Sequence, residues 1–317
     1  MGLSPTTIKC QRLSDKYVCM GLLTVMMIFS LFLLLRDNMT DKEKLSPDEI
    51  QNQFEIKAFN TKYINKTSGD VMFDYKSAMS ALNAAKVSAD DPLLLGLIRR
   101  YYIENPSDLG YNLENPHIRD TSKGQAAFVD EALNHTEKGF YVECGAQSGE
   151  FLSNSLFFER FRSWSGILIE ANPMWYKVLK NKHRKAFTIN ACLSTKPYPS
   201  MVKYGRRRII GDDVIKPDLL EYDEGPYIDV QCFPLHSILL ALNQVKVDYF
   251  SLDVEGAEKP ILDTIPWDKV DIKMMSIEYN KWIGGEKSLK TYMQNKHYKF
   301  LTSLTERHVA DIIVQKI

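Results

Sequence analysis

Short apolar runs alternate with amphipathic stretches from Gly139 to the end of the chain. This alternation is typical of βαβ units, in which parallel strands are buried and helices cover the sheet. The last two apolar runs are separated by only three residues, which predicts an antiparallel hairpin. We therefore expect an α/β domain with a mainly parallel seven-stranded sheet. The expected strands are Phe140–Glu143, Gly166–Glu170, Phe187–Ala191, Val247–Val254, Ile272–Tyr279, Tyr298–Leu304 and His308–Ile317. The expected helices are Phe151–Phe161, Trp175–Asn181, Ser237–Leu242 and Ala257–Leu262.

A long apolar segment lies near the N-terminus. Tyr17–Leu35 contains 19 residues without a charge and is bounded by Lys16 and Arg36. A helix of this length nearly spans a hydrocarbon core of about 30 Å. One alternative is the apolar core of a cleaved signal peptide, which is usually shorter and ends near small residues. A buried helix is the other alternative, and we expect an uncleaved membrane anchor.

The charges that flank this anchor do not decide its orientation, because three basic residues lie close to it on each side. The preceding tail is only 16 residues long, as in a signal anchor, and N-x-T sequons follow the span. We expect residues 1–16 in the cytosol, residues 17–35 in the membrane and the C-terminal domain in the lumen or outside. Asn65 and Asn134 are the expected glycosylation sites, whereas Asn38 lies too close to the membrane to be a good acceptor.

The chain between the anchor and the α/β domain is polar and low in strand signal. Residues 36–90 are therefore expected to form a stem, with a short helix near Met79–Lys86, where good helix formers gather. Asp91 and Pro92 suit the cap and the first turn of a further helix. The expected domain covers residues 91–317.

The charge balance argues against one large class of function. Lys+Arg and Asp+Glu both number 40, and Arg206–Arg208 is a short basic cluster. Nucleic-acid binders usually carry a basic excess, so no nucleic acid is expected as a partner. The five cysteines form no C-x-x-C pair, which leaves no zinc or redox motif, and no metal site is expected. Cys192 and Cys232 are the natural intradomain pair, but the sequence does not establish that they are close.

A glycine-containing turn follows the first expected strand. The segment GFYVECGAQSGE places Glu143, Gly145 and Gly149 in a strand–turn–helix unit. Glycines let the backbone pass close to a ligand, and the helix that follows begins with free N–H groups. The spacing is not G-x-G-x-x-G, so a dinucleotide is not the favoured ligand. An ordinary tight turn is the alternative.

Glu170 ends the next expected strand, roughly 20 residues after the glycine turn. An acid at this position is typical of ribose recognition in Rossmann-like sheets, because one carboxylate accepts hydrogen bonds from both ribose hydroxyls. The alternative is a solvated side chain. Glu143 and Glu170 both fall at strand ends where such sheets bind ligands, which favours the binding role.

A third motif, VDYFSLDVEGAE, contains Asp253 and Glu255. In an extended chain residues i and i+2 point to the same side, so we expect these two carboxylates side by side. Two like charges held together raise the pKa of one of them, which suits a general base or a shared cation. The alternative is capping of the helix near Ala257, which accounts for one carboxylate but not for both. Glu278 adds a further acid at the end of the fifth strand.

These segments resemble a known family. The stretches YVECGAQSGE, GILIEANP and VDYFSLDVEGAEKPILDTIPW are similar to the FkbM-type methyltransferase domain. The anchor, the stem and the stretches QAAFVDEALNHTEKGFYVECGAQSGE and DVQCFPLHSILLALN more closely resemble the Star-like family of insects and other arthropods. The resemblance covers roughly Asp91–Ile317. It implies a Rossmann-like fold of the S-adenosylmethionine (SAM) methyltransferase type, preceded by one transmembrane helix.

The resemblance also implies roles for the motif residues. The glycine turn would pass under the methionine part of SAM, the acid after the second strand would take the ribose, and the third motif would lie beside the transferred methyl group. The implied cofactor-binding residues are Glu143, Gly145, Gly149 and Glu170, and the implied catalytic residues are Asp253 and Glu255.

The chain departs from the family pattern at three positions. Glu143 replaces a common Asp, and Gln147 stands where FkbM domains often have Asn. Ser251 stands where bacterial members often have Lys, which removes a positive charge near the reaction centre. The third departure bears on catalysis more than on binding.

Two functions of different classes follow from the resemblance. Star-like proteins are type II membrane proteins that help to move membrane-tethered growth-factor precursors from the endoplasmic reticulum to the Golgi and endosomes, in EGF receptor signalling. This implies a transmembrane growth-factor precursor or another client membrane protein as the partner. It also implies a location in endoplasmic reticulum and Golgi membranes, extending to late endosomes and the plasma membrane.

The alternative is an active SAM-dependent O-methyltransferase that acts on a hydroxyl acceptor in the secretory pathway. Asp253 or Glu255 would orient or deprotonate that acceptor, and most of the rate gain would come from alignment of the two reactants. SAM is made in the cytosol, so a lumenal enzyme would need it supplied.

Overall fold

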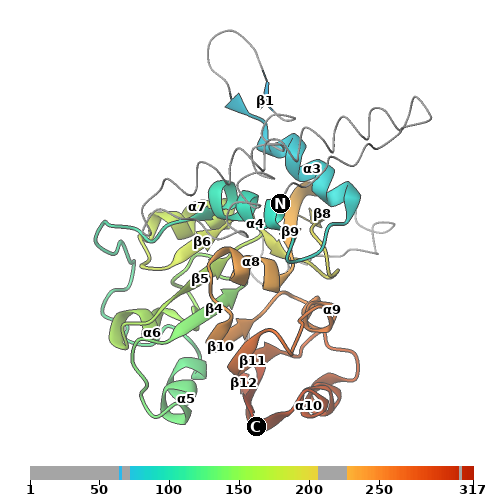
Figure 1. The fold of residues 1–317 in the computed structure, drawn as a ribbon. Helices are drawn as coiled ribbons and strands as arrows, with labels where there is room; N and C mark the ends of the chain where they lie inside the picture. The colour runs from blue at the N-terminus through green and yellow to red at the C-terminus, as the bar shows by residue number, and fades with distance from the viewer. Residues whose placement is uncertain (1–63, 66–71, 206–226, 307–308) are drawn as a thin grey trace, which may run out of the picture. The chain divides into compact units, whose positions relative to one another are not determined.

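The computed structural model describes residues 64–65, 72–205, 227–306 and 309–317 (Figure 1). The expected membrane segment 17–35 and most of the expected stem lie outside these residues. Among the helices that are described, none combines the length and the apolar character needed to cross a membrane. In the stem region, β1 (Ile64–Asn65) and β2 (Met72–Phe73) pair as two short antiparallel strands.

The main sheet contains eight strands: β3 (Ile103–Glu104), β4 (Phe140–Cys144), β5 (Ser165–Ile169), β6 (Phe187–Ile189), β10 (Lys246–Leu252), β11 (Asp271–Glu278), β12 (Tyr298–Glu306) and β13 (Val309–Lys316). Their order is β12-β13-β11-β10-β4-β5-β6-β3. The five central strands run parallel, and β12 and β13 form an antiparallel hairpin, so both expectations are confirmed. The expected count of seven is one too low, because the short β3 adds an antiparallel edge beside β6.

Helices cover both faces of this sheet, which gives three layers (Figure 1). Side chains alternate along each strand, so Val142 of β4 joins one core and Tyr141 joins the other. The first core is covered by α4 (Pro92–Leu97), the π-helix η1 (Ile98–Tyr102), α8 (Leu235–Ala241), α9 (Glu258–Asp263) and α10 (Gly285–Asn295). The second is covered by α5 (Gln125–Ala132), α6 (Leu156–Phe161) and α7 (Pro173–Asn181).

The cap at Asp91 is confirmed. Its Oδ1 accepts hydrogen bonds from the backbone N–H groups of Leu93 and Leu94 at 2.9 and 3.0 Å, and Pro92 occupies the first turn. Helices α7, α8 and α9 begin within two residues of their expected starts. Helices α5 and α10 are additional to the four that we expected between the strands.

A helix within the expected stem belongs to the folded core. It is α3 (Tyr75–Ala85), which begins earlier than the expected range Met79–Lys86 and ends one residue before Lys86. Ala78, Met79 and Leu82 are buried in the first core. Asn83 and Gln231 also exchange two amide hydrogen bonds, of 2.8 and 3.0 Å. The compact domain therefore includes a helix upstream of Asp91.

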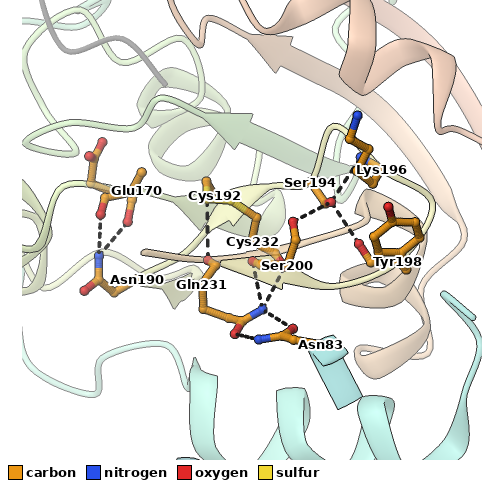
Figure 2. Close-up of a disulfide and its surroundings, with 11 residues drawn as sticks. Asn83, Glu170, Asn190, Cys192, Ser194, Lys196, Tyr198, Ser200, Gln231 and Cys232 are labelled. Atoms are coloured by element: carbon orange, nitrogen blue, oxygen red, sulfur yellow. Dashed lines mark hydrogen bonds between the residues drawn. A yellow bond between two sulfur atoms is a disulfide. The ribbon is translucent and has the colours of Figure 1, made fainter. Parts of the chain in front are cut away.

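A second, three-stranded sheet lies beside the main one. It is formed by β7 (Cys192–Leu193), β8 (Ser200–Gly205) and β9 (Tyr227–Phe233) in the order β7-β9-β8. A disulfide joins Cys192 and Cys232, whose Cα atoms are 4.3 Å apart (Figure 2). Gln231 donates to the carbonyl oxygens of Ser200 and Cys232, which fixes the strand beside the disulfide (Figure 2). The pair that the sequence left open is thus a bond in the structure.

The helix expected to begin at Phe151 begins only at Leu156. The preceding segment is bound to the end of β4 instead of continuing a helix. Both oxygens of Glu143 accept hydrogen bonds from it: Oε1 from the Asn154 N–H at 2.9 Å, and Oε2 from the hydroxyls of Ser153 and Ser155.

Arg184 holds the same segment from the other side. Its side chain is fully buried and forms an ion pair with the buried Glu159, with 3.1 Å between Nε and Oε2. The guanidinium also donates to the carbonyl oxygen of Gly149 and to the Ser155 hydroxyl. A buried charge network therefore shapes the turn after β4.

We expect Arg184→Met to lower the free energy of unfolding by about 3–5 kcal/mol, because it leaves the Glu159 carboxylate buried without its cation. Lys180→Met is the matched control, since it breaks the exposed pair with Glu104 and should cost less than about 1 kcal/mol. Urea unfolding of the two variants measures both values. Equal losses would show that the buried pair does not hold the fold.

We expect the Cys192→Ser/Cys232→Ser variant to lose about 2–4 kcal/mol of stability, because the bond closes a loop between residues 40 apart in sequence. Thermal melts with and without reductant provide the measurement. Reductant should destabilise the wild type and leave the variant unchanged. A wild type that melts at the same temperature in both conditions contradicts the bond.

Candidate functional site

A pocket of about 490 Å³ lies at the carboxyl ends of the parallel strands. The chain runs from β4 outward to β5 and β6, and then returns to place β10 and β11 on the other side of β4. Ligands of open α/β sheets bind at such a reversal of strand order. The volume is typical of a small-molecule site. Residues at the ends of four strands contribute to its walls, among them Cys144, Ile169, Ser251 and Glu278.

The two glycines of the turn have different surroundings. Gly145 lines the pocket with φ +85°, and a Cβ there would lie 1.9 Å from the carbonyl oxygen of Asp253. Only glycine fits this close approach of the turn to β10. Gly149 has φ +74° and faces Leu179 of α7, 3.0 Å from a built Cβ, and it does not line the pocket. The structure therefore places Gly145 in the candidate site and Gly149 behind it.

Glu143 and Glu170 both line the pocket, and both are buried. The oxygens of Glu143 hold the segment after the turn, as described above. Glu170 accepts hydrogen bonds from the backbone N–H groups of Gln147 at 2.6 Å and Asn172 at 2.7 Å. Glu170 therefore positions the glycine turn at the wall of the pocket.

Asp253 and Glu255 line the pocket as expected, but not through an extended strand. Strand β10 ends at Leu252, and Glu255 has φ +61°, so a turn separates the two acids. Glu255 forms an ion pair with Lys281, with 2.5 Å between Oε2 and Nζ. No described group hydrogen-bonds to the carboxylate of Asp253. The geometry argument for a side-by-side pair is therefore wrong, although both acids reach the pocket.

Capping of the helix near Ala257, which we considered for Asp253 or Glu255, is performed by Glu258. Its carboxylate accepts hydrogen bonds from the N–H groups of Val254 and Gly256, at 3.0 to 3.1 Å. It thus holds the turn at the start of α9, where Ala257 gives no side-chain cap.

The acids at this end of the sheet raise one another's pKa. Asp253 opens into the pocket, but surrounding protein raises its pKa well above the usual value, and the charge of Glu278 adds to that effect. Burial raises the pKa of Glu278 to about 8, helped by the charges of Glu255 and Glu258. Burial also raises the pKa of Glu258, against the backbone N–H groups that it accepts. Proton transfer near neutral pH is within reach of such groups.

Three residues of the site come from outside the motif residues. Lys281 brings an ammonium group to the pocket from the loop after β11. Trp175 contributes an aromatic wall, and Asn154 lies beside Ser251, to which its Nδ2 donates at 2.9 Å. Lys281 follows the strand-end acid Glu278 by three residues, which is the one signal in the sequence that could have drawn attention to it.

The comparisons with known proteins give a family match and several similar structures. Residues 143–307 match the family model described as the methyltransferase FkbM domain. No curated protein sequence matches the chain.

Three solved structures illustrate the likeness. An FkbM methyltransferase from Methylobacillus flagellatus is 16% identical, with a TM-score of 0.37, over 76% of this chain and 58% of that one. The N-terminal domain of human METTL16 in complex with SAH is 12% identical, with a TM-score of 0.34, over 87% and 96%. A putative RNA methyltransferase from Pyrococcus horikoshii is 12% identical, with a TM-score of 0.35, over 76% and 98%. The family match covers more than half of the 317 residues, and the chain therefore belongs to the methyltransferase FkbM domain family.

Proposed function

We propose that this domain binds SAM in its pocket and transfers a methyl group to a hydroxyl acceptor. The observation that carries the proposal is the position of Glu170, a buried acid at the end of β5 that lines the pocket and holds the glycine turn through Gln147. SAM, when bound, supplies an electrophilic methyl group. A carboxylate at this strand end suits ribose hydroxyls, and the family match supports the same cofactor.

The other pocket residues fit this cofactor. Gly145 lines the pocket where the turn packs against the backbone of Asp253. Trp175 offers an aromatic surface to a base. Asp253, which carries no hydrogen bond from a described group, is placed to orient an acceptor hydroxyl. Lys281 supplies a positive charge near the reaction centre, which offsets the Ser251 departure from the bacterial pattern.

We expect the full-length chain to bind SAM with micromolar affinity in calorimetry, and Glu170→Ala to weaken that binding at least tenfold. Loss of a hydrogen bond to a charged group costs about 1.5–3 kcal/mol, and tenfold corresponds to about 1.4 kcal/mol. Glu131→Ala is the matched control, because this acid is 82% exposed on α5, outside the pocket.

Glu170 also holds the turn, so a thermal melt must show that the variant is folded. Trp175→Ala is a second variant that leaves these hydrogen bonds intact, and it should also weaken binding. A folded wild type that binds neither SAM nor its demethylated product would rule out the enzyme.

We also propose that the domain works in the secretory pathway, where a Star-like protein would assist export of a transmembrane growth-factor precursor. The Cys192–Cys232 disulfide supports an oxidising compartment. Asn134 supports it too, because this sequon lies on an exposed turn after α5 with φ +52°. The apolar segment 17–35 supports membrane anchoring.

In cells, we expect the chain to carry N-glycans that disappear in Asn65→Gln/Asn134→Gln, and a co-expressed growth-factor precursor to leave the endoplasmic reticulum faster when the chain is present. Endoglycosidase digestion measures both the glycans on the chain and the exit of the precursor from the endoplasmic reticulum. Glu170→Ala separates the two functions, since an export role without catalysis survives this change. An unglycosylated chain with no effect on the precursor contradicts the secretory proposal.

A further inference from the structure

Carboxylates gather at the C-terminal ends of β10 and β11 without a cation to balance them. One oxygen from each of Asp253, Glu258 and Glu278 lies within 4.8 Å of the others. Lys281, the nearby cation, is paired with Glu255. Among the described residues, no Lys or Arg forms an ion pair with any of the three acids. Glu258 and Glu278 are buried, whereas Asp253 is exposed toward the pocket, so the cluster is open to a cation from that side.

Two buried acceptor atoms beside this cluster have no hydrogen-bond partner among the described residues. They are Oε2 of Glu278 and Oδ1 of Asn154. Both side chains are more than nine-tenths buried, with 7% exposed in each case. Asn280 donates to the other oxygen of Glu278, and Ser251 accepts from the Nδ2 of Asn154. The partnered ends fix each side chain and leave an acceptor free, which is a rare condition for buried groups.

Asn154 and Glu278, the residues that carry the two free acceptors, both line one small cavity. It has a volume of about 30 Å³, and its lining includes Asn154, Asp253, Glu278, Asp311 and the exposed Lys123. This space suits one ion or one water molecule. Water can donate to the two acceptors, whereas a cation can in addition pair with the carboxylates of Asp253 and Glu278. The acid-rich lining therefore points to an ion.

We propose that this cavity binds one hard divalent cation, with the carboxylates of Asp253 and Glu278 and the amide oxygen of Asn154 as ligands. Oxygen-only ligand sets select Mg²⁺, Mn²⁺ or Ca²⁺. Two ligand oxygens on opposite sides of Ca²⁺ are about 4.6–5.2 Å apart, from bonds of about 2.3–2.6 Å, and closer around Mg²⁺. The carboxylate oxygens of Asp253 and Glu278 lie within 4.8 Å of each other, which is close enough for both to reach one ion. Glu258, which holds the turn, adds negative charge beside it.

The ion site opens toward the main pocket, because Asn154, Asp253 and Glu278 line both cavities. This step rests on the proposed function. An acceptor hydroxyl that coordinated the ion would lose its proton to solvent more readily, and Asp253 would then orient the acceptor through the ion. The substrate class would be hydroxyl compounds able to chelate a metal, such as vicinal diols of sugars.

Calorimetric titration of the full-length chain with Mn²⁺, repeated with Mg²⁺ and Ca²⁺ alone, tests the site. We expect binding of one ion with a submillimolar Kd. Glu278→Gln should weaken it at least tenfold, and Asn154→Ala several-fold. Asp271→Asn is the control, because Asp271 is an exposed acid at the opposite end of the same strand. This variant should bind the ion as tightly as the wild type does.

Glu278→Gln keeps the size and shape of the side chain, so the variant should fold, and a thermal melt checks this. No binding of any of the three ions at millimolar concentration overturns the proposal, as does unchanged affinity in both ligand variants. SAM titration of the same preparation separates the two proposals: SAM binding without metal binding removes only the ion site. Metal binding without SAM binding keeps the ion site and removes the methyltransferase.

Discussion

The site depends on one buried cation, the guanidinium of Arg184. It neutralises Glu159 and donates to groups of the segment that leaves the glycine turn. The hydroxyl of Tyr141, a residue of β4, donates to the same Glu159 at 2.5 Å. Without this cation, the buried Glu159 carboxylate would lose its counter-charge and the Gly149 carbonyl oxygen its side-chain donor. The pocket wall formed by Gln147, Phe151 and Asn154 therefore rests on an electrostatic arrangement rather than on a regular helix.

The strands could be predicted from the sequence because buried parallel strands are nearly continuous apolar runs. The start of α6 could not, because Ser153 and Ser155 bind to Glu143 rather than continuing the turn, and that contact depends on the folded sheet. The second sheet was missed for another reason. β8 is largely solvent-accessible, and β7 has only two residues, so neither gives a strong pattern before the disulfide holds them together.

The candidate site was predicted in part. Strand-end acids such as Glu170 and Asp253 reach the pocket because parallel strands end at the same edge of the sheet. Gly149 was assigned to the pocket from its motif but supports α7 packing, since glycine spacing does not reveal which neighbour requires it. Lys281 and Asn154 were not predicted as site residues, because their roles depend on contacts between distant segments. Each is a polar residue without a distinctive local pattern, and only the fold brings them to the acids.

The disulfide lies at the wall of the pocket, because Cys192 itself lines it together with Leu193 and Tyr204 of the second sheet. Binding equilibria that share a structure are linked in both directions. A ligand that prefers the oxidised wall would protect the disulfide from reductants, and closure of the bond would in turn raise the affinity for that ligand. The affinity of the pocket for that ligand would then be highest once the disulfide has formed, so ligand occupancy would depend on whether the chain has been oxidised.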